Sequence, residues 1–441
     1  RIPWSAIRTL LGQVVYGGRL DNDFDQRLLD SFLEDMFTPR CFGDDFKLMH
    51  GVSELMAPES GTSKAQFMAW AERLPENESP AWLGLPENAE LLLLLNQSRQ
   101  FLNRLLKMQV SSADDDDDYG STQKRAASAA GGADGERPAW ARVLLKFVDA
   151  WRSQLPKSID SLKPADGNTN NPLFRFFARE VAIGRKLLGE IRQDLDQLAE
   201  VCDGTQKQTN RLRSLMTNIT KGTSHSLTHS LTHSLTHATR TNATLSITTG
   251  IIPKEWRKYS VPDTVSLTAW LVDFQKRIAQ LQHLAKHHNY HHVWMGGMFN
   301  PEAYMTATRQ ASARAHQWSL EKLRLHARVL SDGVAADTSD STSFIVTGTT
   351  IEAAVWDENK RQLELCNEMT NSMPPIQFTW QNTEDDGTTA AEQSVHQVVL
   401  AVYLHETRLE CLFSVPLACS DQVPLTAWYQ RGVALLATRY G

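Results

Sequence analysis

The sequence has few of the features that mark a membrane protein or a disulfide-stabilised protein. Its longest uninterrupted apolar run, Leu91–Leu95, is far shorter than the roughly 20 residues that a helix needs to cross a bilayer. The five cysteines are scattered, and no two of them form a Cys-x-x-Cys pair. This spacing is typical of a reducing compartment and not of a disulfide framework. We therefore expect a cytoplasmic protein without a membrane partner.

A strongly basic composition is also lacking. The formal net charge is −6 at pH 7, and no basic face stands out in the sequence. Nucleic acid is a polyanion, so a protein of this charge would be repelled by it more than attracted. We therefore expect no nucleic-acid partner. A length of 441 residues is enough for two or three soluble domains, and the first residues, which include no initiator Met, indicate a piece of a longer polypeptide.

The motifs of nucleotide hydrolysis and of common hydrolases are missing as well. No GxxxxGK[ST] loop occurs, and the Gly-Gly pairs that begin at Gly17, Gly131 and Gly296 are not followed by the Lys that such a loop requires. No GxGxxG, GxSxG or HExxH motif is present either. We therefore expect no catalytic residue and no cofactor-binding residue in this chain.

One acidic segment resembles the start of a calcium-binding loop. Asp21, Asp23 and Asp25 have the required spacing, but the sixth and twelfth positions hold Gln26 and Phe32 instead of Gly and Glu. The calcium interpretation therefore fails, and helix capping explains the acidic residues.

Two histidine clusters have the four-residue spacing at which a helix can present a pair of metal ligands. The clusters are His225, His229, His233 and His237, within the repeat HSLTHSLTHSLTH, and His283, His287 and His291 beside His288 and His292. Neither has a recognisable second shell of orienting groups, and in the repeat the spacing is simply the unit length. We therefore predict no metal site.

Two stretches have the composition of flexible loops. Residues 110–137 contain the run Asp114–Asp118 followed by Ser, Ala and Gly, and residues 222–249 contain the histidine repeat. Lys124 and Arg125 precede Ser128 at the spacing of a basophilic kinase site. Ser128 is thus a possible phosphorylation site.

Helical periodicity dominates the sequence up to about residue 330. Asn300 and Pro301 are a good N-cap and first helical residue, and Gly296 and Gly297 permit a close backbone approach just before them. The expected helices cover residues 4–16, 88–109, 171–202, 206–221, 265–284 and 300–327. Two more are expected from the apolar faces formed by Phe24, Leu28, Phe32 and Leu33 and by Trp140, Leu144, Phe147 and Trp151.

From about residue 331 the apolar period changes from helical to two, which predicts strands. The expected strands are Phe344–Thr350, Ile351–Trp356, Gln362–Leu365, Ile376–Trp380, Val395–Leu404 and Arg408–Val415, with a hairpin turn at Asp357–Lys360. No helix separates them, so an antiparallel sheet closing toward a barrel is the natural arrangement. The predicted fold class is α+β, mainly α.

Four separated blocks resemble cytoplasmic dynein heavy chains, and they occur in that family's order: YGGRLDNDFDQRLL, LFRFFAREVAIGRKLLGEIRQDL, GGMFNPEAYMTATRQ and RGVALL. The residues that carry the resemblance are Tyr16, Gly17, Gly18, Asp25, Gln26, Arg27, Gly296, Gly297, Pro301, Glu302, Thr306, Arg309, Gln310, Trp318, Arg431 and Gly432.

The resemblance implies a piece near the C-terminus of a minus-end-directed, ATP-driven microtubule motor. Residues 1–87 would form the small helical subdomain of the last AAA+ module, residues 88–330 the helical part of a C-terminal domain, and residues 331–441 an antiparallel six-stranded barrel. An AAA+ small subdomain can present a sensor arginine, and Arg8, Arg19 and Arg27 lie on suitable helices. By resemblance, however, the sixth module of dynein holds no working site, so we do not expect this role.

In that family ATP and Mg belong to other modules, and the microtubule is held by a stalk that is absent here. The implied partners are the other AAA+ modules of the same heavy chain, the subunits of the dynein complex and a second heavy chain. The resemblance therefore implies a non-catalytic segment, associated with the cytoskeleton, that completes and braces the AAA+ ring and modulates motor output. The alternative is a docking module for a regulator or subunit of the dynein complex.

Overall fold

The computed structural model describes residues 2–43, 46–47, 62–74, 79–83, 85, 88–98, 101–102, 139–164, 169–220, 251–262, 265–288, 290–330, 342–383 and 396–438. Ser128, the histidine repeat and both expected flexible loops lie outside these ranges. In the described part of the protein, no helix combines the length and the apolar character that a membrane crossing requires.

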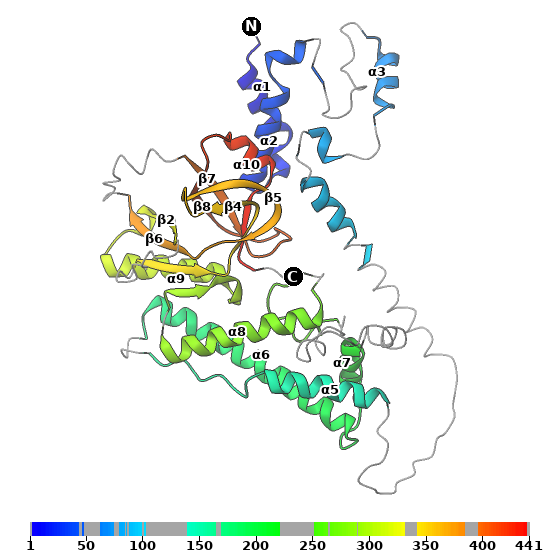
Figure 1. Ribbon diagram of the computed structural model, residues 1–441, viewed down its shortest axis with the longest axis vertical. Helices are drawn as coiled ribbons and strands as arrows, with labels where there is room; N and C mark the ends of the chain where they lie inside the picture. Colours follow the sequence, from blue (N-terminus) through cyan, green and yellow to red (C-terminus); the bar gives the residue numbers. More distant parts are fainter. Residues whose placement is uncertain are drawn as a thin grey trace.

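The N-terminal helices form a small unit at the top of Figure 1. Helix α1 (Trp4–Leu10) runs into a π-helical turn at Leu11–Val15 and a 3-10 turn at Gly17–Arg19, and α2 (Asp23–Met36) follows. The Asn22 side chain accepts a hydrogen bond from the Phe24 N–H and caps α2, while Asp23 and Asp25 lie in the first turn of the helix. Helix α3 (Lys64–Ala71) and helical residues at 88–98 and 101–102 come next.

A helical array lies at the opposite end of the molecule (Figure 1). It contains α5 (Ala139–Gln154), α6 (Pro172–Cys202), α7 (Asn210–Thr220) and α8 (Leu267–His287). Helix α6 confirms the expected helix at 171–202, and Asn171 caps it through its side-chain oxygen. Its buried face includes Val181, Leu188, Ile191, Leu195 and Leu198, the side chains whose spacing predicted the helix.

Helix α9 (Pro301–His316) begins where it was expected but ends eleven residues earlier. Gln317 closes it in the left-handed conformation, with φ 58°. Residues Leu323–Val329 then form strand β2 instead of continuing the helix. The residues of β2 alternate between apolar and polar, and they pair along the full length of β6 (Ile376–Asn382), so the expectation of a helix to Ala327 is wrong.

Two sheets follow, and they do not form the closed antiparallel barrel that was expected. The first has the strand order β1-β3-β6-β2 and the second the order β5-β4-β9-β7-β8. The strands not yet introduced are β1 (His292–Trp294), β3 (Ser343–Thr347), β4 (Thr350–Asp357), β5 (Gln362–Ser372), β7 (Gln397–Tyr403), β8 (Cys411–Ala418) and β9 (Ala434–Leu436).

The six expected strands are present as β3 to β8, and three others join them. Two of the additional strands, β1 and β9, make parallel pairs, with β3 and β7 respectively. The expected turn joins β4 to β5, where the Asp357 side chain accepts hydrogen bonds from the N–H groups of Asn359 and Lys360. The α+β class is thus confirmed. The prediction of a barrel is wrong because the strands form two separate sheets. Strand β1 joins the first sheet in parallel next to β3, and β9 lies between β4 and β7 in the second sheet.

A large apolar core runs from α5 through the helices into both sheets. A smaller cluster on the outer side of the second sheet is formed by Ala401, Tyr403, Ala434 and Leu436, and Phe24 of α2 packs against it. The first and last parts of the described sequence therefore lie side by side, with α10 (Leu425–Gln430) next to α2 (Figure 1).

Candidate functional site

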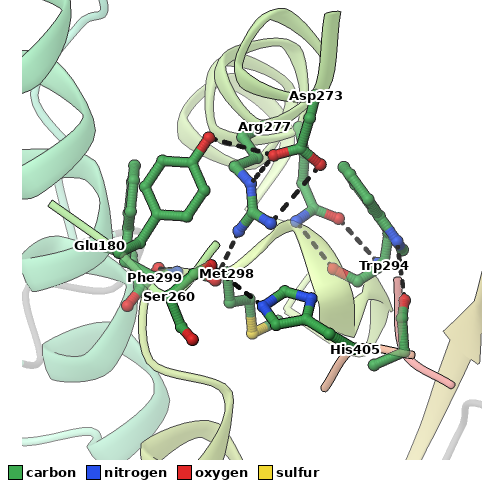
Figure 2. A network of polar contacts seen from close by, with 11 residues as sticks. Glu180, Ser260, Asp273, Arg277, Trp294, Met298, Phe299 and His405 are labelled. Atoms are coloured by element: carbon green, nitrogen blue, oxygen red, sulfur yellow. Dashed lines mark hydrogen bonds and ion pairs between the residues drawn. The ribbon is translucent and has the colours of Figure 1, made fainter. Parts of the chain in front are cut away.

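The last part of the described sequence touches both ends of the molecule. We call residues 425–438 the terminal segment; it contains α10, Arg431, Gly432 and β9. On one side it meets the N-terminal helical unit that contains α1 and α2, which we call the lid. We call these contacts the lid junction. On the other side it meets a buried polar network at the base of the helical array, which we call the central junction (Figure 2).

The lid junction begins at the N-terminus of α2. A side-chain hydrogen bond joins Asn22 to Tyr403 of β7, and it lowers the pKa of that phenol, which burial raises overall. Two residues further on, Phe24 packs on the small outer cluster of the second sheet. The capped end of α2 is thus fixed on β7 and β9 by one polar and one apolar contact.

Arg27 extends this contact along α2 to α10. Its guanidinium lies 5.1 Å from the ring centre of Phe24 and 5.8 Å from that of Tyr429, within the range of cation–π attraction. Further along α2, the Asp35 carboxylate accepts a hydrogen bond from the Gln430 side-chain amide at 3.3 Å. Arg27 and Asp35 therefore hold α2 against α10 at two successive places.

Arg431 and Gly432 complete the lid junction. The Asn88 side-chain amide donates to the Arg431 carbonyl oxygen at 3.2 Å, and this contact places the start of the helix at residue 88 on the end of α10. The Arg431 guanidinium donates to the carbonyl oxygen of Cys366 on β5 at 3.3 Å. Gly432 has φ +63°, and Arg408 donates to its carbonyl oxygen at 2.7 Å. A side chain at position 432 would be strained in this conformation.

The central junction is organised by Arg277, which is only 1% exposed. Its Nε donates to Asp273 Oδ2 at 2.6 Å, and its Nη1 donates to the Met298 carbonyl oxygen at 2.8 Å (Figure 2). The ring centre of Tyr259 lies 4.3 Å from the guanidinium carbon, and the Tyr259 hydroxyl donates to the same Asp273 oxygen. One buried cation therefore links α8 to the segment before α9 and to the segment before α8.

Glu180 of α6 holds the turn that begins α9. Its two carboxylate oxygens accept hydrogen bonds from the N–H groups of Phe299 at 2.7 Å and Asn300 at 3.1 Å. Burial raises the pKa of this carboxyl to about 7, although both N–H groups and the charge of Arg277 oppose the rise. The Asn300 side chain in turn caps α9 by accepting from the Ala303 N–H, as predicted.

The terminal segment reaches the central junction at Ala437. The indole N–H of Trp294 donates to the Ala437 carbonyl oxygen at 3.2 Å. A Cβ on Gly296 would lie 2.2 Å from that same oxygen, so the predicted close backbone approach at Gly296 is confirmed. Gly297 is equally confined, because a Cβ there would lie 2.3 Å from the Trp294 ring.

His405, just after β7, connects the second sheet to the segment that precedes α8. Its Nε2 lies 3.0 Å from the Ser260 carbonyl oxygen, so the neutral tautomer with a proton on Nε2 donates this hydrogen bond. Burial lowers the pKa of His405, which keeps the ring neutral next to Arg277. The Ser260 hydroxyl donates to Glu410 at 2.7 Å and extends the link to the β7–β8 turn.

The signature residues divide into those that the fold brings together and those that it does not. Arg27 lies over the ring of Tyr429, two residues before Arg431, and Gly296 lies against the Ala437 carbonyl oxygen. Pro301 and Glu302 lie in the first turn of α9, and the Thr306 hydroxyl donates to the Glu302 carbonyl oxygen. Arg309 of α9 lies over the ring of Trp380 on β6, and the charge of Asp25 acts on Tyr403 of β7. Gln26 bonds Asp30 and Trp318 stacks on His316 within their own segments, where Tyr16, Gly17, Gly18 and Gln310 also lie.

Sequence reasoning missed the residues that organise the central junction. Glu180 lay inside a recognised block but was not singled out, and Asp273 and Arg277 were not considered. The available signal was the i, i+4 spacing of Asp273 and Arg277 on an otherwise apolar face of α8. Charged groups are costly to bury unless they are paired and hydrogen-bonded. Trp294, His405 and Asn88 have no distinguishing pattern in the sequence.

Metal-ligating side chains do not gather in this region. Across the ranges that the structure describes, no three His, Cys, Asp or Glu side chains lie close enough to hold a metal ion. His283 and His287 lie next to each other on α8 with ring centres 4.5 Å apart, and His291 bonds the Ser343 carbonyl oxygen. The described site holds backbone segments together; its charged groups contact each other, backbone carbonyl and N–H groups, and aromatic rings.

The described part of the protein thus combines N-terminal helices, a helical array and two sheets, which the terminal segment ties together. Two family models match nearly the whole sequence. The AAA lid domain of dynein heavy chains matches residues 1–89, and the C-terminal domain of dynein heavy chains matches residues 95–230 and 231–437. The protein belongs to the dynein heavy chain family.

Individual relatives agree with this assignment. The cytoplasmic dynein heavy chains of Dictyostelium discoideum and Drosophila melanogaster are 44% and 36% identical, and each alignment covers 99% of this sequence. The Mus musculus protein dynein axonemal heavy chain 5 is 24% identical over 99% of this sequence. The 441 residues span only 8% or 9% of the length of these relatives. The alternative of a docking module is not favoured by matches of this kind.

Proposed function

We propose that this segment braces the AAA+ ring of a cytoplasmic dynein heavy chain and modulates the output of the motor. In this proposal the segment itself is non-catalytic, and ATP and Mg are bound by other modules of the heavy chain. The absence of a GxxxxGK[ST] loop from the sequence supports this division of labour. The higher identity to cytoplasmic than to axonemal heavy chains supports the cytoplasmic class.

The observation that carries the proposal is the position of the terminal segment. The Arg431 carbonyl oxygen accepts from Asn88 on the lid side, and the Ala437 carbonyl oxygen accepts from Trp294 at the central junction. A movement of the lid is therefore transmitted through β9, a strand of 3 residues that is hydrogen-bonded to both β4 and β7. A short, doubly paired strand resists stretching, so while the lid junction is closed a displacement of the N-terminal helices reaches the helical array.

Exposed apolar side chains support this proposal, because they offer surfaces on which the rest of the heavy chain would pack. On the lid they include Leu10, Val14, Val15 and Phe42, and on the helix that starts at residue 88 they include Leu91, Leu94, Leu95, Phe101 and Leu102. A helix with apolar side chains exposed around it is stable only when other surfaces cover it. We assign these surfaces to other AAA+ modules of the same heavy chain.

The whole protein would then be an ATP-driven, minus-end-directed microtubule motor of the cytoplasm, working with a second heavy chain and other subunits of the dynein complex. It would reach the microtubule through a stalk outside this segment. Bracing acts on the motor only if docking of the segment differs in free energy between ring conformations. A difference of about 2 kcal/mol, within the range of typical coupling energies, changes an equilibrium roughly thirtyfold.

The experiment is single-molecule motility and ATPase of the parent heavy chain with Arg27→Ala and Gln430→Ala. Deleting residues from Glu321 onward is a poorer test, because it removes β2 to β9 and uncovers the core that α9 packs against. We expect run length or stall force to change while basal ATP turnover persists. The matched control is Arg19→Ala, an exposed lid arginine outside the junction. Unchanged motility in the double variant would contradict bracing through the lid junction.

A further inference from the structure

Strand β2 presents positive charge on one face and apolar side chains on the other. Leu323 and Val329 are buried, and Leu325 and Ala327 pack against the main core. The intervening side chains are Arg324, His326 and Arg328, of which both arginines are exposed. Because side chains alternate across a strand, these three lie in a row on the outer face of the first sheet. We call them the β2 stripe.

No acidic residue of the neighbouring strand neutralises the β2 stripe. On β6, its cross-strand partners are Gln381, Thr379 and Gln377 in that order. Within the described ranges, neither Arg324 nor Arg328 takes part in an ion pair or a side-chain hydrogen bond. Two guanidinium groups therefore point outward in a protein segment whose net charge is −6. On a helix Arg324 and Arg328 would also share a face, but only the strand places His326 in the same row.

The spacing of the stripe fits an extended polypeptide. Residues two apart on a strand are about 6.6 Å apart, so the stripe is roughly 13 Å long. Alternate carboxylates on an extended acidic segment have the same spacing. The fork of a guanidinium also matches a carboxylate better than a single ammonium group would. A row of two arginines and one histidine with uncharged amide and hydroxyl neighbours is thus complementary to an extended acidic segment.

We propose that the β2 stripe binds an extended acidic segment of the same heavy chain, located outside these 441 residues. The inference rests on the proposed bracing function and names the chemistry of one of its contacts. The occupant is assigned to the same polypeptide because these residues span only 8% or 9% of the relatives' length, so most of the surface that faces them belongs to the same molecule. Its local concentration exceeds that of any separate peptide.

Carbodiimide cross-linking of the full heavy chain tests the proposal. This reagent joins a lysine amine to a carboxylate in direct contact and does not act on arginine. Arg324→Lys and Arg328→Lys keep the charge of the stripe and make it reactive, and Arg213→Lys on the exposed side of α7 is the matched control. We expect cross-links from positions 324 and 328 to Asp or Glu residues outside this segment, at least several times more abundant than from position 213.

Three results would overturn the proposal. One is cross-linking only to acidic residues of this segment, such as Asp332 or Asp385, which would make the stripe self-neutralised. Another is cross-linking to a separate protein. The third is no enrichment over Arg213→Lys, which would leave the arginines as charges that protect an edge strand from aggregation. None of these touches the lid junction, so altered motility of the Arg27→Ala and Gln430→Ala motor would still support bracing.

A second variant gives an independent readout. Arg324→Glu with Arg328→Glu replaces attraction by repulsion, and we expect about tenfold faster hydrogen exchange in the acidic segment that the cross-links identify. Lys207→Glu with Arg213→Glu changes the net charge equally at exposed positions elsewhere and serves as the control. Equal exchange in both double variants would overturn the assignment of that segment to the stripe.

Discussion

The two junctions of the terminal segment are built from different kinds of contact. At the central junction the organising groups are a cation and two carboxyls that are almost fully buried, Arg277, Asp273 and Glu180. At the lid junction the contacts are single hydrogen bonds and a stacked arginine near the surface, such as Gln430 with Asp35. Buried charged hydrogen bonds are costly to break, whereas exposed ones exchange readily with water.

Under the proposed bracing function, this difference gives the two junctions different roles. The central junction fixes the sheets on the helical array permanently, because opening it would leave charges in the interior. Opening the lid junction breaks only a few hydrogen bonds, so a movement of the ring would separate the contacts there before those of the central junction. The predictions below test that contrast, beginning with the change that should have the largest effect.

Arg277→Ala should be the most destabilising single change. It leaves the Asp273 carboxylate buried without its cation and removes a donor to the Met298 carbonyl oxygen. Loss of one partner of a buried pair typically costs about 3–5 kcal/mol. The measurement is urea unfolding of the protein followed by tryptophan fluorescence. Lys276→Ala, an exposed neighbour on α8, is the control, and equal effects of the two changes would show that Arg277 has no special role.

Stability should depend on pH through Glu180. Its pKa is raised from 4.5 to about 7 in the folded protein, so the folded state binds the proton more tightly than the unfolded state. The resulting stabilisation is fully present below pH 4.5 and is lost as the pH rises to about 7. At about 1.4 kcal/mol per pKa unit, the total is on the order of 3 kcal/mol.

Thermal unfolding at mildly acidic and mildly alkaline pH, with Glu180→Gln as the comparison, measures this effect. The amide keeps one acceptor oxygen for the turn before α9 but cannot ionise. We expect the variant to lose most of the decline in stability that accompanies ionisation of Glu180. An unchanged pH profile in Glu180→Gln would mean that other groups cause the decline.

The helices and the long strands could be predicted from the sequence because their signals are local. Helix α6 has a full apolar face, and the alternation in Arg408–Val415 indicated the strand that the structure places at Cys411–Ala418 as β8. Strand β2 was not predicted although Leu323, Leu325, Ala327 and Val329 alternate with polar residues, because the helix expected at 300–327 was continued past Gln317, where α9 ends. Strands β1 and β9 have 3 residues each, too few to show any period.

The site was predictable only in part, for a related reason. Gly296 and Asn300 indicate a tight approach and a helix cap, which are properties of one residue and its neighbours. The contacts of Arg27 with Tyr429 and of Asn88 with Arg431 join residues from opposite ends of the sequence. A single sequence contains no information on such pairs. Knowing that two blocks are characteristic of a family does not reveal that they touch.

Gly296→Ala should have a smaller but clear effect on the central junction. The new methyl group would lie 2.2 Å from the Ala437 carbonyl oxygen, which belongs to backbone and cannot simply rotate away. Overpacking of this kind costs about 1–3 kcal/mol. Hydrogen exchange should therefore accelerate in β9 and at Trp294. Gly189→Ala on the exposed side of α6, where a methyl group meets nothing within 4 Å, should be neutral or stabilising.

The smallest predicted effect belongs to the lid junction, and it is the one most relevant to a brace. Arg27→Ala removes the guanidinium between Phe24 and Tyr429, which is worth about 0.5–1 kcal/mol at a partly exposed site. Hydrogen exchange should increase by roughly two- to fivefold in α2 and α10 and stay unchanged in α8, while Arg19→Ala should change neither. Faster exchange in α8 would show that the lid and central junctions open together. The two junctions would then not differ in how readily they open. A lid junction that cannot open separately from the central junction could not respond on its own to a movement of the ring.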